Sequence, residues 1–194
     1  MGLSMRKTIK TLLASAAIMA IATTAEAAKP RVKLTTNMGV IVVELYPDKA
    51  PITVKNFLEY VRGKHYDGTV FHRVIRGFMI QGGGFDTSLA EKAERDPIRN
   101  EADNGLRNEP GTLAMARLPE PHTASAQFFI NTANNTFLNH TAKNRDGWGY
   151  AVFGIVVEGM DVVKRIEMSP VADVGRMEAV PRKAVIIEKA EIVQ

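Results

Sequence analysis

The sequence contains no cysteine in its 194 residues. Disulfides and cysteine thiolates are therefore excluded, and the fold must depend on its apolar core. The four histidines show no His-x-x-x-His spacing, which argues against a zinc site. A Gly-x-Ser-x-Gly elbow is missing, as is a glycine-rich loop followed by Lys-Ser or Lys-Thr. These absences predict that the protein uses neither a metal nor a cofactor, and they argue against a serine hydrolase.

The sequence also lacks an apolar run long enough to span a bilayer near its N-terminus. The run at residues 11–23 is well short of the roughly 20 residues that a spanning helix needs. It follows three basic residues and precedes the small-x-small pattern Ala-Glu-Ala at 25–27. This arrangement favours a cleaved signal peptide, residues 1–27, over a membrane anchor. It predicts an exported, periplasmic protein that is free of the membrane after cleavage and begins at or near Ala28.

A strong charge of one sign is lacking too. Three of the 25 basic residues and one of the 21 acidic residues lie in residues 1–27, so the mature chain has a net charge of only +2. Its basic residues form no cluster, which argues against nucleic acid as a partner. The remaining 167 residues, 28–194, are about one domain in length. They contain no repeat or linker, and nothing in them requires a partner chain, so we expect a monomer.

The hydropathy pattern predicts a mainly β protein. Period-two alternation over 31–46, interrupted at Asn37-Met38-Gly39, predicts a hairpin, and helical spacing of apolar residues predicts a helix that ends with Gly63 at its C′ position. A second, short helix is predicted over 159–168. Strands are predicted at 111–116, 127–131, 150–157 and 185–193, together with the run at 71–83. Many short strands without a βαβ rhythm favour a closed antiparallel barrel with helices at its ends.

The run at 71–83 has an unusual composition. Arg73 and Gln81 are embedded in apolar sequence, and Gly77 interrupts the run where the chain has to turn. Two interpretations remain open from these residues. The run is either two strands whose arginines reach solvent, or the wall of a pocket that contains an arginine and an amide.

Apolar residues, one arginine and several amides suit a reaction that needs no proton transfer and no covalent step. Rotation about a Xaa-Pro peptide bond is such a reaction. Its barrier of about 18–20 kcal/mol comes from lost amide resonance. In the twisted transition state the prolyl nitrogen regains a lone pair, so a fixed hydrogen-bond donor there binds the transition state better than either planar isomer.

Four blocks of the sequence, in order, resemble the cyclophilin-type peptidyl-prolyl isomerases. These are FHRVIRGFMIQGG at 71–83, GTLAMA at 111–116, SAQFFI at 125–130 and VFGIVVEGM at 152–160. The resemblance implies a closed eight-stranded antiparallel β-barrel capped by two α-helices. It also implies that the partners are proline-containing, unfolded or partly folded polypeptides. The segment at 100–108 is similar to the periplasmic bacterial branch of the family.

The resemblance also implies a role for individual residues. Arg73 matches the catalytic arginine, whose guanidinium is a rigid, permanently charged fork that lysine should replace poorly. Gln81 and Gln127 match polar groups that hold the substrate backbone and orient the arginine. Four residues match the floor and walls of the proline pocket: Phe78, Met79, Phe129 and Leu138. Ala116 and Arg117 match the stretch that pairs with the peptide main chain.

This sequence departs from the family pattern at four positions. Arg76 stands where many members have proline, and Arg117 replaces a common asparagine. Tyr150 occupies the position of a family histidine, and Phe137 that of the tryptophan that binds cyclosporin in many eukaryotic members. We therefore expect weak cyclosporin binding with isomerase activity retained. A binding module or chaperone that keeps the groove but mainly holds unfolded chains is the alternative function.

Overall fold

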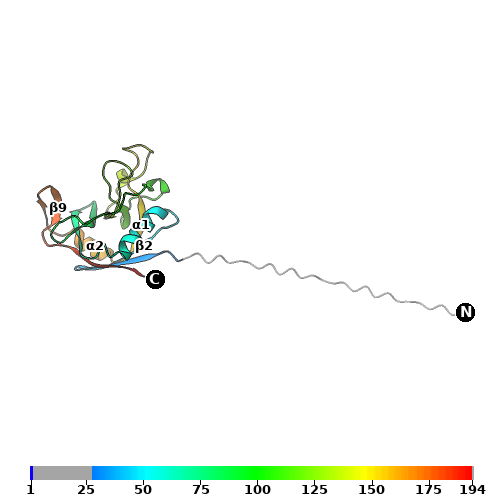
Figure 1. The fold of residues 1–194 in the computed structure, drawn as a ribbon, viewed down its shortest axis with the longest axis horizontal. Coiled ribbons are helices and arrows are strands. Elements are labelled where there is room, and N and C mark those ends of the chain that lie inside the picture. The colour runs from blue at the N-terminus through cyan, green and yellow to red at the C-terminus, as the bar shows by residue number, and fades with distance from the viewer. Residues whose placement is uncertain (2–27, 194) are drawn as a thin grey trace.

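The computed structural model describes Met1 and residues 28–193; the predicted signal peptide, apart from Met1, lies outside the described residues. Eight strands close into an antiparallel barrel in the order β1-β10-β3-β4-β6-β5-β7-β2. This confirms the predicted fold. Figure 1 shows the ribbon of this domain. The barrel strands are β1 (Arg31–Thr36), β2 (Gly39–Leu45), β3 (Thr69–Ile75), β4 (Met79–Asp86), β5 (Thr112–Met115), β6 (Phe128–Asn131), β7 (Val152–Glu158) and β10 (Ile186–Val193).

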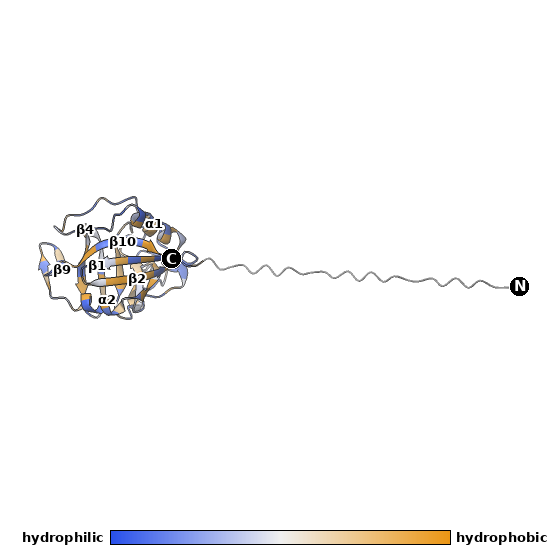
Figure 2. Cartoon of the chain, turned by 90° about the horizontal axis from the view of Figure 1, so that it is seen from below, coloured by the Kyte–Doolittle hydropathy of each residue, from blue (hydrophilic) through white to orange (hydrophobic). Residues whose placement is uncertain are grey.

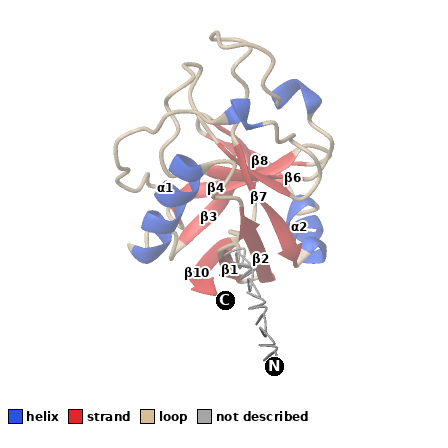
Figure 3. Cartoon of the chain, turned by 90° about the vertical axis from the view of Figure 1, so that its right-hand side faces the viewer, coloured by secondary structure: helices blue, strands red, loops and turns tan. Residues whose placement is uncertain are grey.

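Two α-helices flank the barrel, on opposite sides in Figure 3. They are α1 (Pro51–Arg62) and α2 (Met160–Glu167), and two short 3₁₀ helices, η1 (Ala102–Asn104) and η2 (Thr136–Leu138), lie in the connections. Within the described part of the chain, no helix is both long and apolar enough to cross a bilayer.

The first hairpin follows its sequence pattern. Val32 pairs with Val43 and Leu34 with Ile41, and all four side chains are buried in the barrel core. Polar and apolar residues are mixed along β1, β2 and β10 (Figure 2), because alternate side chains face the core and the outside. The period-two pattern therefore fixes which face of this sheet is buried.

Helix α1 places one aromatic side chain in the centre of the core. The Phe57 ring is fully buried, and its centroid lies 5.1–5.5 Å from those of Tyr66, Phe128 and Phe153. The predicted end of this helix is wrong by one residue. Gly63 is the C-cap, with φ −75°, and Lys64, with φ 55°, takes the left-handed C′ position.

A second apolar cluster lies apart from the barrel core. On β6, Phe128 belongs to the barrel core, whereas Phe129 packs outside it. Successive residues of a strand face opposite sides, so one short strand supplies both clusters. The outer cluster consists of Met79, Ala114, Phe129, Leu138 and Val152, and it forms the floor of the site described below.

The sequence did not predict the hairpin β8 (Val171–Val174) and β9 (Met177–Pro181), which forms a separate two-stranded sheet and contacts β3. Val171 and Val174 of β8 are exposed, and burial is confined to Val180 and Pro181 at the end of β9. With so short a buried stretch the hairpin leaves no clear period-two signal. It lies beside the strand that carries Arg73, so it matters for the site.

Candidate active site

A small cavity of about 140 Å³ opens on the outer cluster. Nine of the eleven side chains predicted for the site line it. They are Arg73, Phe78, Met79, Gln81, Ala116, Arg117, Phe129, Leu138 and Tyr150. These residues come from strands and from the loops between them, and the barrel's closure brings them together.

Arg73 lies on β3 directly opposite Gln81 on β4. Its side chain is 34% exposed and lines the cavity, whereas Arg76 in the following turn is exposed. The run at 71–83 is therefore the wall of a pocket at Arg73. Among residues 28–193, the one carboxylate within 4 Å of this guanidinium is Glu178 of β9, with Nη2 and Oε2 separated by 3.8 Å.

The two glutamines are joined to each other. Gln81 Nε2 donates a hydrogen bond of 3.1 Å to Gln127 Oε1. Gln127 lines the neighbouring groove rather than the cavity itself. A Cβ atom at Gly84 would lie 2.6 Å from Gln127 Cδ, so only glycine leaves room for this pair. The Gln81 amide thus donates to Gln127, and its Oε1 is its acceptor atom.

The apolar wall is tightly packed. Met79, Phe129 and Leu138 are buried, and the Phe129 ring meets the Tyr150 ring at 5.8 Å, edge to face. Phe137, predicted to bind substrate, does not line the cavity. It is 73% exposed and stacks on the outer side of Phe78, with the ring centroids 5.6 Å apart.

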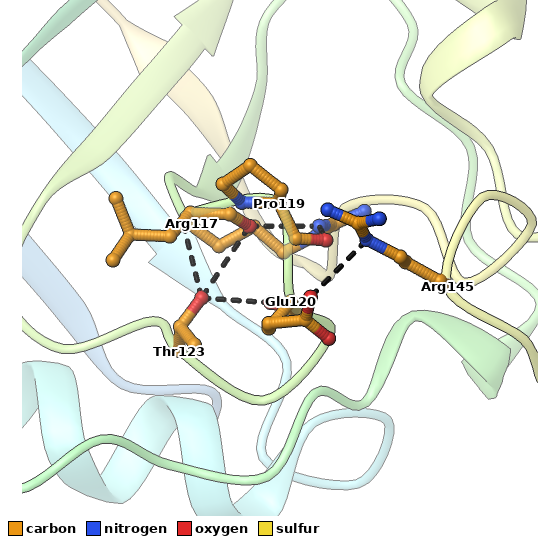
Figure 4. Close-up of polar contacts among 6 residues, drawn as sticks. Arg117, Pro119, Glu120, Thr123 and Arg145 are labelled. Carbon is orange, nitrogen blue, oxygen red and sulfur yellow. Dashed lines mark hydrogen bonds and ion pairs between the residues drawn. The ribbon is translucent and has the colours of Figure 1, made fainter.

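Arg117 forms the opposite wall, and its Nε donates to Gly149 O at 2.9 Å. Its Nη1 donates to Leu118 O and Pro119 O at 2.9 and 3.0 Å, on the loop drawn in Figure 4. The guanidinium also lies 4.5 Å over the ring of Tyr150. Arg117 thus has most of its donors occupied and acts as a rigid partition between the cavity and the neighbouring groove.

The turn before Phe78 is anchored by α2. Gly77, with φ 70°, donates its N–H to Glu167 Oε1 at 2.7 Å, and Thr132 Oγ1 donates to the same oxygen. Among the described residues beyond the two chain neighbours, no atom comes within 4 Å of the place that a Cβ at Gly77 would occupy. The left-handed backbone, and not crowding, therefore requires glycine there. The predicted turn at Gly77 is confirmed.

The sequence did not reveal a network of buried asparagine side chains behind the pocket. Asn131 Nδ2 donates to Asn108 Oδ1 at 3.1 Å, and Asn135 Nδ2 donates to Asn131 Oδ1 at 2.6 Å. The network also bonds the backbone carbonyls of Phe78, through Asn135, and of Leu138, through Asn108. It therefore holds two of the pocket-lining residues in place. Asparagines in irregular stretches usually indicate turns, so nothing in the sequence indicated that these side chains are buried and bonded to each other.

His72 precedes Arg73 on β3 and does not line the cavity that contains Arg73. It is 5% exposed, and its Nδ1 has no hydrogen-bond partner in the described structure. Burial lowers the pKa of His72 to about 4, so the imidazole is neutral at physiological pH. It is a structural residue in this geometry and brings no titrating charge to the cavity.

We expect His72 to make folding pH-dependent below neutrality. The unfolded chain binds a proton at this imidazole near pH 6.5, whereas the folded chain does so only near pH 4. The free energy of unfolding should therefore fall as the pH falls from 6.5 to 4, by up to about 3 kcal/mol from this group. Urea unfolding of wild type and His72→Phe across that range checks it. An unchanged pH dependence in the variant would show that other groups are responsible.

Comparison with known proteins places this fold in a family. The family model for cyclophilin-type peptidyl-prolyl cis-trans isomerases matches residues 31–192. The chain belongs to the cyclophilin family. Among curated proteins, this cyclophilin is 56% identical over 161 residues to peptidyl-prolyl cis-trans isomerase cyp18 of Streptomyces antibioticus, covering 83% of this chain and 97% of that one. It is 54% identical over 157 residues to peptidyl-prolyl cis-trans isomerase B of Escherichia coli, covering 81% of this chain and 96% of that one.

Solved structures agree with this assignment. A cyclophilin-type isomerase of Cryptosporidium parvum superposes with a TM-score of 0.70 at 26% identity, covering 86% of this chain and 98% of that one. A second structure of that protein, solved in the presence of the dipeptide Ala-Pro, gives 0.69 at 27% identity, covering 84% and 99%. The cyclophilin described here is thus a peptidyl-prolyl cis-trans isomerase, and its substrates are proline-containing polypeptides.

Proposed function

We propose that Arg73 is the catalytic residue and that the 140 Å³ cavity binds the proline ring. The observation that carries this proposal is the convergence of one half-buried guanidinium with Phe78, Met79 and Phe129 on one small apolar cavity. The apolar walls hold the ring, and the guanidinium donates to the prolyl nitrogen and its carbonyl region as the amide twists. A donor that meets a lone pair present only in the transition state lowers the barrier without transferring a proton.

The remaining residues hold the substrate main chain. Ala116 and Arg117 line both the cavity and the neighbouring groove, and we assign to this stretch the pairing with an extended peptide. To Gln81 we assign the role of accepting a hydrogen bond from Arg73 during turnover and so orienting the guanidinium toward the amide. Gln127 holds Gln81 in place by accepting from its Nε2. Tyr150 and Leu138 close the far wall. Phe137 supports Phe78 from outside and contributes at the rim.

We further propose that the enzyme works in the periplasm on exported proteins as they fold. The support is the signal-like composition of residues 1–27, followed by a domain that begins at β1. Expression in a Gram-negative host with the full sequence should yield a periplasmic protein whose N-terminus is at or near Ala28. Recovery of uncleaved chain in the cytoplasm or in the membrane fraction would overturn this. Acceleration of a proline-limited refolding reaction by the purified protein would support the folding role.

Cyclosporin should bind weakly. Phe137 stands where the resemblance expects a tryptophan, and its ring is stacked on Phe78 without an indole N–H to donate. We expect a dissociation constant in the micromolar range or above, together with full isomerase activity, and Phe137→Trp should tighten binding by about tenfold or more. Calorimetric titration of the two proteins measures this. Nanomolar binding by the wild type would contradict the prediction.

The same proposal describes a monomer that needs no cofactor, nucleic acid or membrane to turn over. Light scattering at micromolar concentration tests the oligomeric state. A mass twice that of the mature chain would contradict it.

A further inference from the structure

The contact between Arg73 and Glu178 joins the proposed catalytic residue to the hairpin outside the barrel. Glu178 Oε2 lies 3.8 Å from Arg73 Nη2, beyond hydrogen-bonding distance, and the Glu178 side chain is 74% exposed. Exposed ion pairs of this kind add little to the stability of a fold. The pair therefore adds little to the free energy of unfolding. We consider instead how the Glu178 carboxylate changes the electrostatic potential beside Arg73.

The backbone around Glu178 is held in an uncommon conformation. The next residue, Ala179, has φ 53°, which non-glycine residues seldom adopt. Its N–H donates a 3.0 Å hydrogen bond to Asp173 Oδ1 on the facing strand. This bond engages one oxygen of the Asp173 carboxylate and restrains the backbone of β9 beside Glu178. The hairpin thus places a negatively charged residue next to Arg73.

The substrate must pass this charge. If Arg73 donates to the prolyl nitrogen and carbonyl, as proposed above, the residue after the proline leaves the cavity on the Arg73 side. Glu178 is more exposed than Arg73, with 74% against 34%, so its carboxylate is open to a side chain that leaves the cavity past Arg73. Arg117 carries the other charge that lines the cavity, but backbone carbonyls already bind it.

We propose that Glu178 is a specificity-determining residue that favours a basic side chain, and disfavours an acidic one, immediately after the proline. A lysine or arginine there gains a carboxylate partner and is shielded from the like charge of Arg73. A glutamate or aspartate meets the carboxylate and is repelled. Without Glu178, the charge of Arg73 remains, and the preference should reverse toward acidic residues.

Magnetization-exchange NMR on three blocked pentapeptides tests this proposal. They carry Ala-Pro-Lys, Ala-Pro-Gln or Ala-Pro-Glu in otherwise identical sequences. For wild type we expect kcat/KM for the lysine peptide to exceed that for the glutamate peptide by about threefold to tenfold at low salt. The ratio should fall toward one at about 1 M salt, where the Debye length is near 3 Å. Glu178→Gln should lower the ratio to one or below, and Glu178→Lys should invert it.

Glu158→Gln is the matched control, because it removes another exposed glutamate at the end of β7, a strand that does not adjoin β3 in the barrel. It should keep the wild-type ratio. The inference is overturned if Glu178→Gln keeps the wild-type ratio, or if it lowers all three rates equally, which would make Glu178 a support for Arg73 only. The inference rests on the proposed site, and the two can fail separately. An Arg73→Ala variant with wild-type turnover would refute the site, whereas normal turnover without charge preference refutes only the role of Glu178.

Discussion

Arg73→Ala should lower kcat/KM for an Ala-Pro peptide by about 10²–10³-fold, the usual effect of removing one preorganised donor from a transition state. Peptide affinity should change much less, because Phe78, Met79 and Phe129 still form the cavity. Arg73→Lys should recover only a small part of the loss, since an ammonium group cannot present two parallel N–H groups to the nitrogen and the carbonyl. A coupled assay gives the rates, and calorimetric titration gives the affinities.

Arg76→Ala is the control for this experiment. Arg76 lies three residues further along and is exposed, so its removal deletes the same charge without touching the cavity. We expect its kcat/KM to stay within about twofold of wild type. If Arg73→Ala instead weakened peptide affinity and turnover by the same factor, the holding function of a chaperone would be the better description.

Asn131→Leu should lower the free energy of unfolding by about 4 kcal/mol. The Asn131 side chain is fully buried and bonds Asn108, Thr112 and Asn135. Leucine is similar in size but would leave several buried polar groups unpaired, each at a cost of about 1–3 kcal/mol. The loss should be visible as a lower midpoint in urea. Because Asn135 also bonds the Phe78 carbonyl, KM should rise as well.

Asn134→Ala provides the comparison, since this neighbouring asparagine is exposed. Its effect should be within about 0.5 kcal/mol. A loss below about 1 kcal/mol in Asn131→Leu would mean that water or rearranged side chains satisfy the network. The pocket would then depend on apolar packing alone.

Where the buried face is continuous, the sequence predicted the fold correctly. The alternation along β1 and the spacing of apolar residues in α1 each reflect one buried side of an element, which a local pattern records directly. Strand β7 begins at Val152 and not at Tyr150, because Tyr150 N bonds Leu138 O and the residue belongs to the pocket wall. In the β8–β9 hairpin only the end of β9, at Val180 and Pro181, is buried, and this is too short a pattern to predict the hairpin.

The sequence predicted those site residues that stand out in a local pattern. Arg73 and Gln81 are conspicuous because polar residues inside an apolar run are unusual. Arg73 and Gln81 come close to Phe129 only because the barrel closes. The sequence implied this closeness through the family resemblance of its four blocks, and not through any local pattern. The Glu178 contact and the asparagine network join residues far apart in the chain. No local spacing in the sequence encodes such contacts.

The most direct test separates rotation from binding. At saturating peptide, NMR line shapes give the rate at which an enzyme-bound Ala-Pro bond interconverts between cis and trans. If the Arg73 guanidinium stabilises the twisted amide, this rate should fall by about 100-fold or more in Arg73→Ala while the peptide stays bound. An unchanged rate on the variant enzyme would show that the cavity itself, without the arginine, accelerates the rotation, and would contradict the mechanism.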